Sequence, residues 1–310
     1  MATKEMRAVY AETLVELAAK DPRIVVLEAD LMRATGTDVF KAAYPDRCFN
    51  AGVAEADMVG VAAGLSTEGK IPFAATFGCF ASRRAFDQFF VSCAYARLSV
   101  KLVGTDPGIT AAYNGGTHMP FEDLGIMRTV PDLDIVEPSD PVSLRALVRE
   151  LAARPGCAYL RLHRKAIEPL YPEGEAFAVG KGRLLRGGRH LAIVALGAFM
   201  VGEALKAADI LAVRGVEASV IDALSLKPLD APLILTEARR TGAVLTAENH
   251  QVSGGLGSAV AELLAESGAA KLGRVGIKGE FGEVGTEGYL AGRFKLRAED
   301  IAEAAAALIA

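Results

Sequence analysis

Several features that define common protein classes are missing from this chain of 310 residues. The longest apolar run, around Leu191 to Gly202, is too short to cross a bilayer, and the N-terminus lacks the apolar core of a signal peptide. The few cysteines are widely separated and include no C-x-x-C pair, which argues against a zinc site and a disulfide framework: Cys48, Cys79, Cys93 and Cys157. A reduced, cytoplasmic protein is therefore expected.

The chain also has no large excess of positive or negative charge. Lys and Arg together number 34 and Asp and Glu number 38, so the formal net charge is only -4. This balance gives no electrostatic reason to expect nucleic acid or an anionic membrane as a partner. Tryptophan is absent while glycine and alanine are abundant, a composition that suits close packing of helices on a sheet.

What is present is an alternation of apolar runs with helical patterns. A continuous apolar run is typical of a strand that is buried on both faces of a parallel sheet. In the first half of the chain such runs predict strands at 23–27, 48–49, 71–76, 98–103, 133–136 and 158–162. In the second half they predict strands at 191–196, 217–221, 243–247 and 275–278.

Helical spacing fills the intervals between these strands. It predicts helices near 6–17, 140–154, 201–214, 232–240 and 254–267, and a last helix from 298 onward. Asp140-Pro141 is a good N-cap and first-turn pair for the second of these. The segment 166–184 is rich in Pro and Glu and is interpreted as a linker. The fold class is therefore predicted to be α/β, with parallel-sheet domains at 1–165 and 185–310.

Ligands of open parallel sheets bind beyond the carboxyl ends of the strands. Asp30, Thr76-Phe77, the glycine-rich loop at 104–117 and Arg164 all follow predicted strands of the first domain. Their convergence on one edge of the sheet predicts a binding site there.

The stretch from Asn50 to Ser66 follows another strand end and carries two carboxyl groups, Glu55 and Asp57, at the start of a small-residue helix. We expect this helix to be buried on several sides, where an ionised carboxylate needs a partner. A carboxyl group held there could pass a proton to a ligand. The alternative is an ordinary acid at the start of a helix, where the macrodipole favours negative charge.

Three motifs in this order resemble those of transketolases. Gly52-Val-Ala-Glu-Ala-Asp-Met-Val-Gly-Val-Ala-Ala-Gly-Leu65 resembles the stretch with their cofactor-activating glutamate. Thr76-Phe-Gly-Cys-Phe-Ala-Ser-Arg-Arg-Ala-Phe-Asp-Gln88 resembles their aromatic segment, and Gly115-Gly-Thr-His-Met-Pro-Phe-Glu122 their substrate-loop histidine motif. The resemblance spans essentially the whole chain, but it covers only the pyrimidine-binding and C-terminal domains of a single-chain transketolase.

The resemblance implies roles for residues around the cofactor, thiamine diphosphate. Glu55 would be catalytic and would hydrogen-bond the aminopyrimidine ring. Phe77 and Phe80 would hold that ring by stacking and edge contacts. Asp30 would lie close to the cofactor, and Arg83 stands where the family has a tyrosine of the aromatic cluster. The alternative for the two phenylalanines is an ordinary place in the core where a strand meets a helix.

Further residues are implied to bind the sugar substrate. His118 would hydrogen-bond sugar oxygens and assist proton movement, and Arg164 would bind a sugar phosphate. Their alternatives are a loop histidine that caps a helix and a solvated arginine at the domain edge. Asp106 stands where the family has a histidine, and Asn114 where it has an aspartate that contacts the donor. Because an acid near a phosphate would weaken its binding by repulsion, the substrate is left open between a less common ketose phosphate and another sugar.

The motif that holds the diphosphate and Mg2+ in transketolases, Gly-Asp-Gly, does not occur in this sequence. Gly254-Gly-Leu-Gly257 fits no phosphate-binding fingerprint and is interpreted as packing at the start of a helix. The chain thus resembles the C-terminal subunit of a split transketolase. An N-terminal partner chain would bind the diphosphate and Mg2+, and the two chains would form a heterotetramer.

Other functions fit parts of the pattern. The beta subunit of a 2-oxo acid dehydrogenase shares the two-domain layout and a similar glutamate, although the matches at 117–122 and 85–88 favour transketolase. A 1-deoxyxylulose-5-phosphate synthase-like enzyme is a further relative, but it is normally one long chain. A non-catalytic scaffold subunit that kept the fold is the alternative from a different class.

Overall fold

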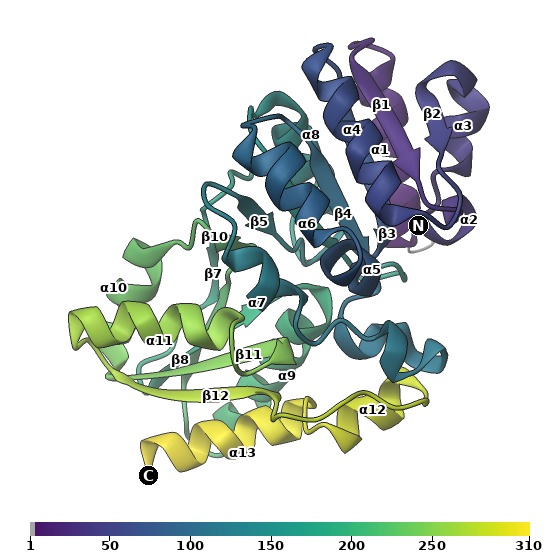
Figure 1. Ribbon diagram of the computed structural model, residues 1–310. Coiled ribbons are helices and arrows are strands. Elements are labelled where there is room, and N and C mark those ends of the chain that lie inside the picture. Colours follow the sequence, from purple (N-terminus) through teal and green to yellow (C-terminus); the bar gives the residue numbers. More distant parts are fainter. Residues whose placement is uncertain (1–3) are drawn as a thin grey trace. The chain divides into compact units, whose positions relative to one another are not determined.

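The computed structural model describes residues 4–310, which form two compact units (Figure 1). The first unit comprises the described residues up to Pro107 together with Ile126–Val179. The second comprises Gly108–Gly125 and Gly180–Ala310. The loop that follows the fourth strand therefore folds with the second unit, although it lies within the first half of the sequence.

The first unit is built on a parallel sheet in which β5, β6, β4, β3, β1 and β2 lie side by side in that order. Its strands are β1 (Ile24–Glu28), β2 (Cys48–Asn50), β3 (Ile71–Phe77), β4 (Lys101–Thr105), β5 (Asp134–Val136) and β6 (Ala158–Leu162). Apart from the outward-facing end of β2, these strands are buried, as the apolar runs predict. The predicted strands of this half are confirmed, with small shifts at their ends.

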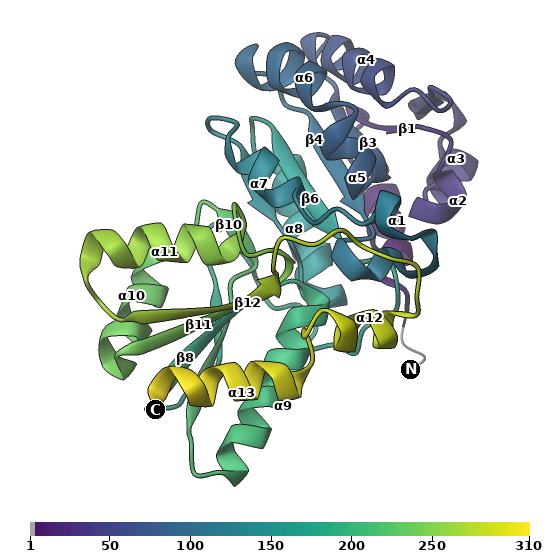
Figure 2. The same cartoon turned by 60° about the horizontal axis from the view of Figure 1, so that its bottom comes forward.

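Helices cover this sheet. They are α1 (Met6–Ala18), α2 (Met32–Thr35), α3 (Asp38–Ala43), η1 (Pro45–Arg47), α4 (Glu55–Thr67), α5 (Gly78–Arg83), α6 (Phe86–Gln88), the π-helix η2 (Phe89–Tyr95) and α8 (Pro141–Ala153). Figure 2 shows α4 and α6 together on one side of the strands. The predicted N-cap of α8 is confirmed, since Asp140 Oδ1 accepts a hydrogen bond from Ser143 N at 2.7 Å.

The helix that begins at Glu55 differs from the expectation in one respect. Met58, Val59, Ala62 and Ala63 are buried against the unit, while Val61 is 42% exposed and Gly64 is exposed beside it. Burial on several sides is therefore wrong for the single chain. Small residues allow a helix to pack closely against a neighbour. They do not show whether that neighbour belongs to the same chain.

The second unit contains a mixed sheet in the order β12-β11-β8-β9-β7. Its strands are β7 (Arg183–Arg186), β8 (Leu191–Leu196), β9 (Ala218–Asp222), β11 (Ala243–Gln251) and β12 (Lys271–Ile277), and β10 (Ser225–Lys227) is a short strand of the same unit. Only β7 runs antiparallel, along β9. The sequence pattern missed β7 because an exposed edge strand with arginines at both ends has no apolar run. The predicted α/β class with two sheets is confirmed, and the second sheet is mixed.

The helices of this unit are η3 (Gly108–Asn114), η4 (Gly116–His118), α9 (Ala198–Val213), α10 (Ala231–Thr241), α11 (Leu256–Ser267), α12 (Glu287–Arg293) and α13 (Ala298–Ile309). A further helix, α7 (Asp123–Arg128), contains the boundary at Gly125. Among residues 4–310, no helix is both long enough and apolar enough to span a membrane.

The loop at 108–125 is held within the second unit by very close contacts. Gly108 has a φ of +53°, and Asn249 Oδ1 accepts a hydrogen bond from the next backbone amide, Ile109 N, at 3.0 Å. A Cβ on Gly116 would lie 2.0 Å from the carbonyl oxygen of Gly282. Glycine is therefore required at both positions for this loop to pack as it does.

Candidate active site

The carboxyl edge of the first unit's sheet holds a buried acid with a cationic partner. Glu55, the first residue of α4, is 4% exposed, and its Oε1 accepts a hydrogen bond from Arg84 Nη1 at 3.0 Å. The Arg84 side chain is half exposed. The requirement that a buried carboxylate be paired is thus met. The sequence did not predict that Arg84 pairs with Glu55. Its only signal was the position of Arg84 next to Arg83 in the aromatic segment.

Aromatic rings extend this pair along the edge. The guanidinium of Arg84 lies 3.9 Å from the centroid of the Phe80 ring, and the Phe80 and Phe77 rings are 5.9 Å apart. The guanidinium of Arg164 lies 5.8 Å from the centroid of Phe77. Arg83 is exposed, and its Nε donates to the Cys79 carbonyl oxygen at 3.2 Å. The structure therefore brings Glu55, the two phenylalanines and Arg164 together.

Asp106 pairs with Arg164 at the same edge. The two side chains are 3.0 Å apart, and Asp106 is 1% exposed. Thr105 Oγ1 donates to Asp106 Oδ2 at 3.0 Å. Burial raises the pKa of Asp106, while Arg164 and the Thr105 hydroxyl oppose that rise. The acid that replaces a family histidine is thus bound to the arginine expected to hold a phosphate.

Asp30 follows β1 and is tied to the stretch that leads to Glu55. Its backbone has a φ of +62°, and its amide donates to Asn50 Oδ1 at 2.9 Å. Asn50 Nδ2 donates in return to Asp30 Oδ1 at 3.3 Å, and Gly52 N donates to Asn50 Oδ1 at 3.1 Å. One asparagine side chain therefore connects the turn after β1 with the turn before α4.

Glu28, two residues before Asp30, is a buried acid to which the sequence analysis assigned no role. Its Oε1 accepts hydrogen bonds from Thr35 Oγ1 at 2.7 Å and Thr37 Oγ1 at 2.6 Å, while its buried Oε2 has no hydrogen-bond partner. Burial raises the pKa of Glu28 to about 7, against the two hydroxyl donors. The acid thereby anchors the segment that follows Asp30.

The remaining predicted residues belong to the second unit's loop. His118 is half-buried at the end of η4, and its Nδ1 lies 2.9 Å from Thr117 Oγ1. Asn114 is exposed at the end of η3. Within η3, Ala112 has a φ of +47° and a ψ of -115°, an unusual conformation for a residue with a side chain.

The glycine-rich stretch at 254–257 is occupied by the protein's own carboxylate. Glu248 Oε2 accepts from Leu256 N at 2.7 Å, and its Oε1 accepts from Gly257 N at 2.8 Å. A Cβ on Gly255 would lie 2.0 Å from Glu248 Oε2. These amides at the start of α11 are the donors that a phosphate would use. The interpretation as packing at the start of a helix is confirmed.

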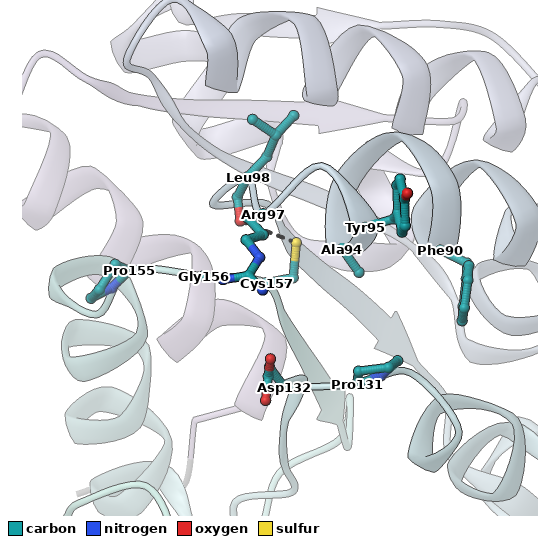
Figure 3. A pocket seen from close by; sticks show the side chains of 10 residues that line it. All are labelled: Phe90, Ala94, Tyr95, Arg97, Leu98, Pro131, Asp132, Pro155, Gly156 and Cys157. Carbon is teal, nitrogen blue, oxygen red and sulfur yellow. Dashed lines mark hydrogen bonds between the residues drawn. The ribbon is translucent and has the colours of Figure 1, made fainter.

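A separate cavity of about 470 Å³ lies at the other end of the first unit's strands (Figure 3). Leu98, Asp132 and Cys157, which come just before β4, β5 and β6, contribute to its lining. None of the predicted site residues lines it. Among residues 4–310, no group of three or more His, Cys, Asp or Glu side chains could hold a metal ion.

Comparison with known families defines the class. The model described as "Transketolase, pyrimidine binding domain" matches residues 2–169, and "Transketolase, C-terminal domain" matches residues 180–301. The chain therefore belongs to the transketolase family, as its motifs indicate. It carries two domains of an enzyme family that depends on thiamine diphosphate.

Individual relatives narrow the class to split transketolases. The chain is 49% identical to the 6-deoxy-6-sulfo-D-fructose transketolase subunit SqwH of Clostridium sp. (strain MSTE9), over 97% of this chain and 93% of that one. It is 41% identical to a putative transketolase C-terminal section of Methanocaldococcus jannaschii, over 97% and 95%. A solved structure titled "Split gene transketolase, inactive beta4 tetramer" has a TM-score of 0.92 and 43% identity, with 98% of each chain covered. The chain is thus a homologue of split transketolase subunits.

We expect the stability of the chain to fall as pH rises because of Glu28. In the folded chain Glu28 keeps its proton up to about pH 7, whereas in the unfolded chain it loses the proton near its ordinary pKa of 4.5. The folded state binds more protons in this window, so stability declines from about pH 4.5 to 7, by ~3 kcal/mol at most. Glu28→Gln should remove that decline and be more stable than wild type at pH 8, as measured by chemical denaturation at pH 5 and 8.

Glu173→Gln serves as the control for this measurement, since Glu173 is exposed. It should keep the wild-type difference between the two pH values. If Glu28→Gln keeps that difference as well, Glu28 does not titrate as described.

We also expect Glu248→Gln to lower the stability of the chain by about 2–3 kcal/mol, because one buried backbone amide at the start of α11 loses a charged acceptor. The midpoint of urea denaturation, followed by circular dichroism, would report this loss. Glu266→Gln changes an exposed acid on the same helix and should leave the midpoint unchanged. Equal midpoints for both variants would show that the carboxylate at 248 is not needed there.

Proposed function

We propose that this chain is the C-terminal subunit of a two-chain transketolase. The enzyme would transfer a two-carbon ketol unit from a ketose or ketose phosphate to an aldose or aldose phosphate. The observation that carries the proposal is the buried carboxyl of Glu55, which begins α4 at the carboxyl edge of a parallel sheet beside Phe80 and Phe77. Membership of the transketolase family supports it.

The residues present fit thiamine diphosphate. Glu55 is a buried acid beside two aromatic rings, a setting suited to a heteroaromatic ring with a basic nitrogen. We propose that Glu55 holds a proton at that nitrogen, that Phe77 and Phe80 pack on the ring, and that Asp30 and Arg83 lie beside the cofactor. When bound, thiamine diphosphate supplies the electron sink for breaking and forming the carbon–carbon bond.

Glu55 can hydrogen-bond the cofactor ring only if its ion pair with Arg84 breaks. The two are unequal, since the Arg84 side chain is 50% exposed while that of Glu55 is 4% exposed. The half-exposed arginine can turn toward water, whereas the acid stays buried. We propose that Arg84 neutralises Glu55 until the ring arrives and then withdraws.

The proposed sugar-binding residues are those that the resemblance to transketolases implies. His118 would hydrogen-bond sugar oxygens and move a proton, Asn114 would contact the donor, and Arg164 with Asp106 would meet the far end of the sugar. The proposed domain limits remain 1–165 for the pyrimidine-binding domain, 166–184 for the linker and 185–310 for the C-terminal domain.

We propose that an N-terminal partner chain holds the diphosphate and Mg2+, and that two of each chain form a cytoplasmic heterotetramer. The names of the relatives as subunits and as a C-terminal section support a divided enzyme. For the substrate, the relative named for 6-deoxy-6-sulfo-D-fructose makes that sugar a candidate donor.

A 1-deoxyxylulose-5-phosphate synthase-type reaction is the second candidate. The synthase of Syntrophotalea carbinolica is 39% identical over 95% of this chain, which spans only 46% of the synthase. Turnover of pyruvate without ketol transfer by the complete enzyme would favour this candidate over transketolase.

We expect activity only when the partner is present. The isolated chain should bind thiamine diphosphate poorly and transfer no ketol unit, because the proposed grip on the diphosphate and Mg2+ lies in the other chain. Calorimetry and a coupled ketol-transfer assay, each with and without the partner chain, measure this. Micromolar, Mg2+-dependent binding by the isolated chain would contradict the division of the site.

We expect Glu55→Gln to lower kcat of the reconstituted enzyme by ~100-fold or more, the usual contribution of a proton-transferring side chain. Glu68→Gln alters an exposed acid just after the same helix and should keep the wild-type rate. An unchanged rate in Glu55→Gln, with normal assembly of the complex, would support the scaffold alternative.

A further inference from the structure

The pair formed by Asp106 and Arg164 arises from two neighbouring strands. β4 and β6 run parallel with Thr105 opposite Leu162, so the residues that follow these strands leave the sheet side by side. Asp106 comes directly after β4, and Arg164 comes two residues after β6. Their side chains meet at 3.0 Å.

Asp106 cannot easily turn away from this contact. Its backbone has a φ of +59°, and its amide donates to the Leu162 carbonyl oxygen at 3.2 Å. Its second carboxylate oxygen accepts the Thr105 hydroxyl at 3.0 Å, and the residue is 1% exposed. Arg164, with 24% of its side chain exposed, is the member of the pair that a ligand can reach.

The Asp106 carboxylate offsets the positive charge that Arg164 offers to a ligand. The two side chains are in direct contact at 3.0 Å, and Asp106 is buried. A phosphate monoester carries about -1.5 to -2 at pH 7. A sulfonate carries a single negative charge, so it lacks the second charge that the carboxylate would repel.

We propose that Asp106 is a specificity-determining residue that makes this site select sugars whose far end carries at most one negative charge, a sulfonate in particular, over phosphate dianions. The proposal rests on the proposed function and specifies its substrate class. Asp106 acts by neutralising the positive charge of Arg164. A dianion bound to that arginine would lie beside the Asp106 carboxylate, which would repel the second negative charge of the dianion. The histidine that the resemblance places at this position in other transketolases would not repel the second charge of a phosphate.

The test uses the complex reconstituted with the partner chain, thiamine diphosphate and Mg2+. Three donors are compared with glycolaldehyde as the common acceptor: 6-deoxy-6-sulfo-D-fructose, D-fructose 6-phosphate and the uncharged L-erythrulose. Wild type should show kcat/KM for the sulfonate at least equal to that for the phosphate. Asp106→Asn should shift the ratio toward the phosphate by about tenfold or more, because it removes the repelling charge.

Asp106→Asn is a narrow change. Asparagine accepts a positive φ, keeps one oxygen for Arg164 and can donate its amide NH2 to the Thr105 hydroxyl, so that mainly the charge is lost. Thr105→Val removes the hydroxyl hydrogen bond and keeps the charge, and it should retain the wild-type ratio. A loss of ratio in Thr105→Val equal to that in Asp106→Asn would assign the effect to packing and overturn the proposal.

Erythrulose separates the two levels of inference. Turnover of erythrulose by wild type together with a clear preference for the phosphate donor, or with an unchanged ratio in Asp106→Asn, would overturn only the role of Asp106. Absence of turnover with all three donors would overturn the proposed function and this role with it. The wild-type ratio needs no variant, so a clear preference of wild type for the phosphate would overturn the proposal even if Asp106→Asn fails to fold.

Discussion

The structure depends on how buried carboxylates are compensated. An ionised acid removed from water requires an opposite charge or several donors, or it takes up a proton. Glu55 meets this requirement with Arg84, Asp106 with Arg164, and Glu248 with two backbone amides. Glu28 has only hydroxyl donors, and its pKa is raised to about 7. The four carboxyl groups are thus accommodated in three ways: by a guanidinium, by backbone amides and, for Glu28, by a raised pKa.

The parallel sheet explains why two of these acids lie at one edge. Parallel strands end on the same side, so the residues after β3, β4 and β6 converge whatever their distance in sequence. Arg164 reaches Phe77, and Arg84 reaches Phe80, which connects the two ion pairs through aromatic rings. Glu248, the buried acid of the second unit, stabilises a helix terminus instead. Glu248 occupies the start of α11 and so closes a loop that resembles a phosphate site by composition.

Much of the fold could be predicted because apolar periodicity depends on local order. Runs such as Leu191–Leu196 are buried on both faces of a sheet, and their short length and β-branched residues favour a strand over a helix. The edge strand Arg183–Arg186 could not be found in this way, since its side chains are largely solvated. The motif around Glu55 singled out an acid that is buried and paired with an arginine, and the rings of Phe77 and Phe80 lie close together.

The family, the order of strands and helices, and the residue types available for chemistry follow from spacing along the chain, so the sequence alone is enough to predict them. The pairing of charged groups is settled in the folded molecule. Arg84 rather than Arg83 pairs with Glu55, Asp106 rather than solvent faces Arg164, and Glu248 fills its own helix start. These pairings depend on the directions of side chains that lie between 8 and 58 residues from their partners in sequence, which no local pattern records.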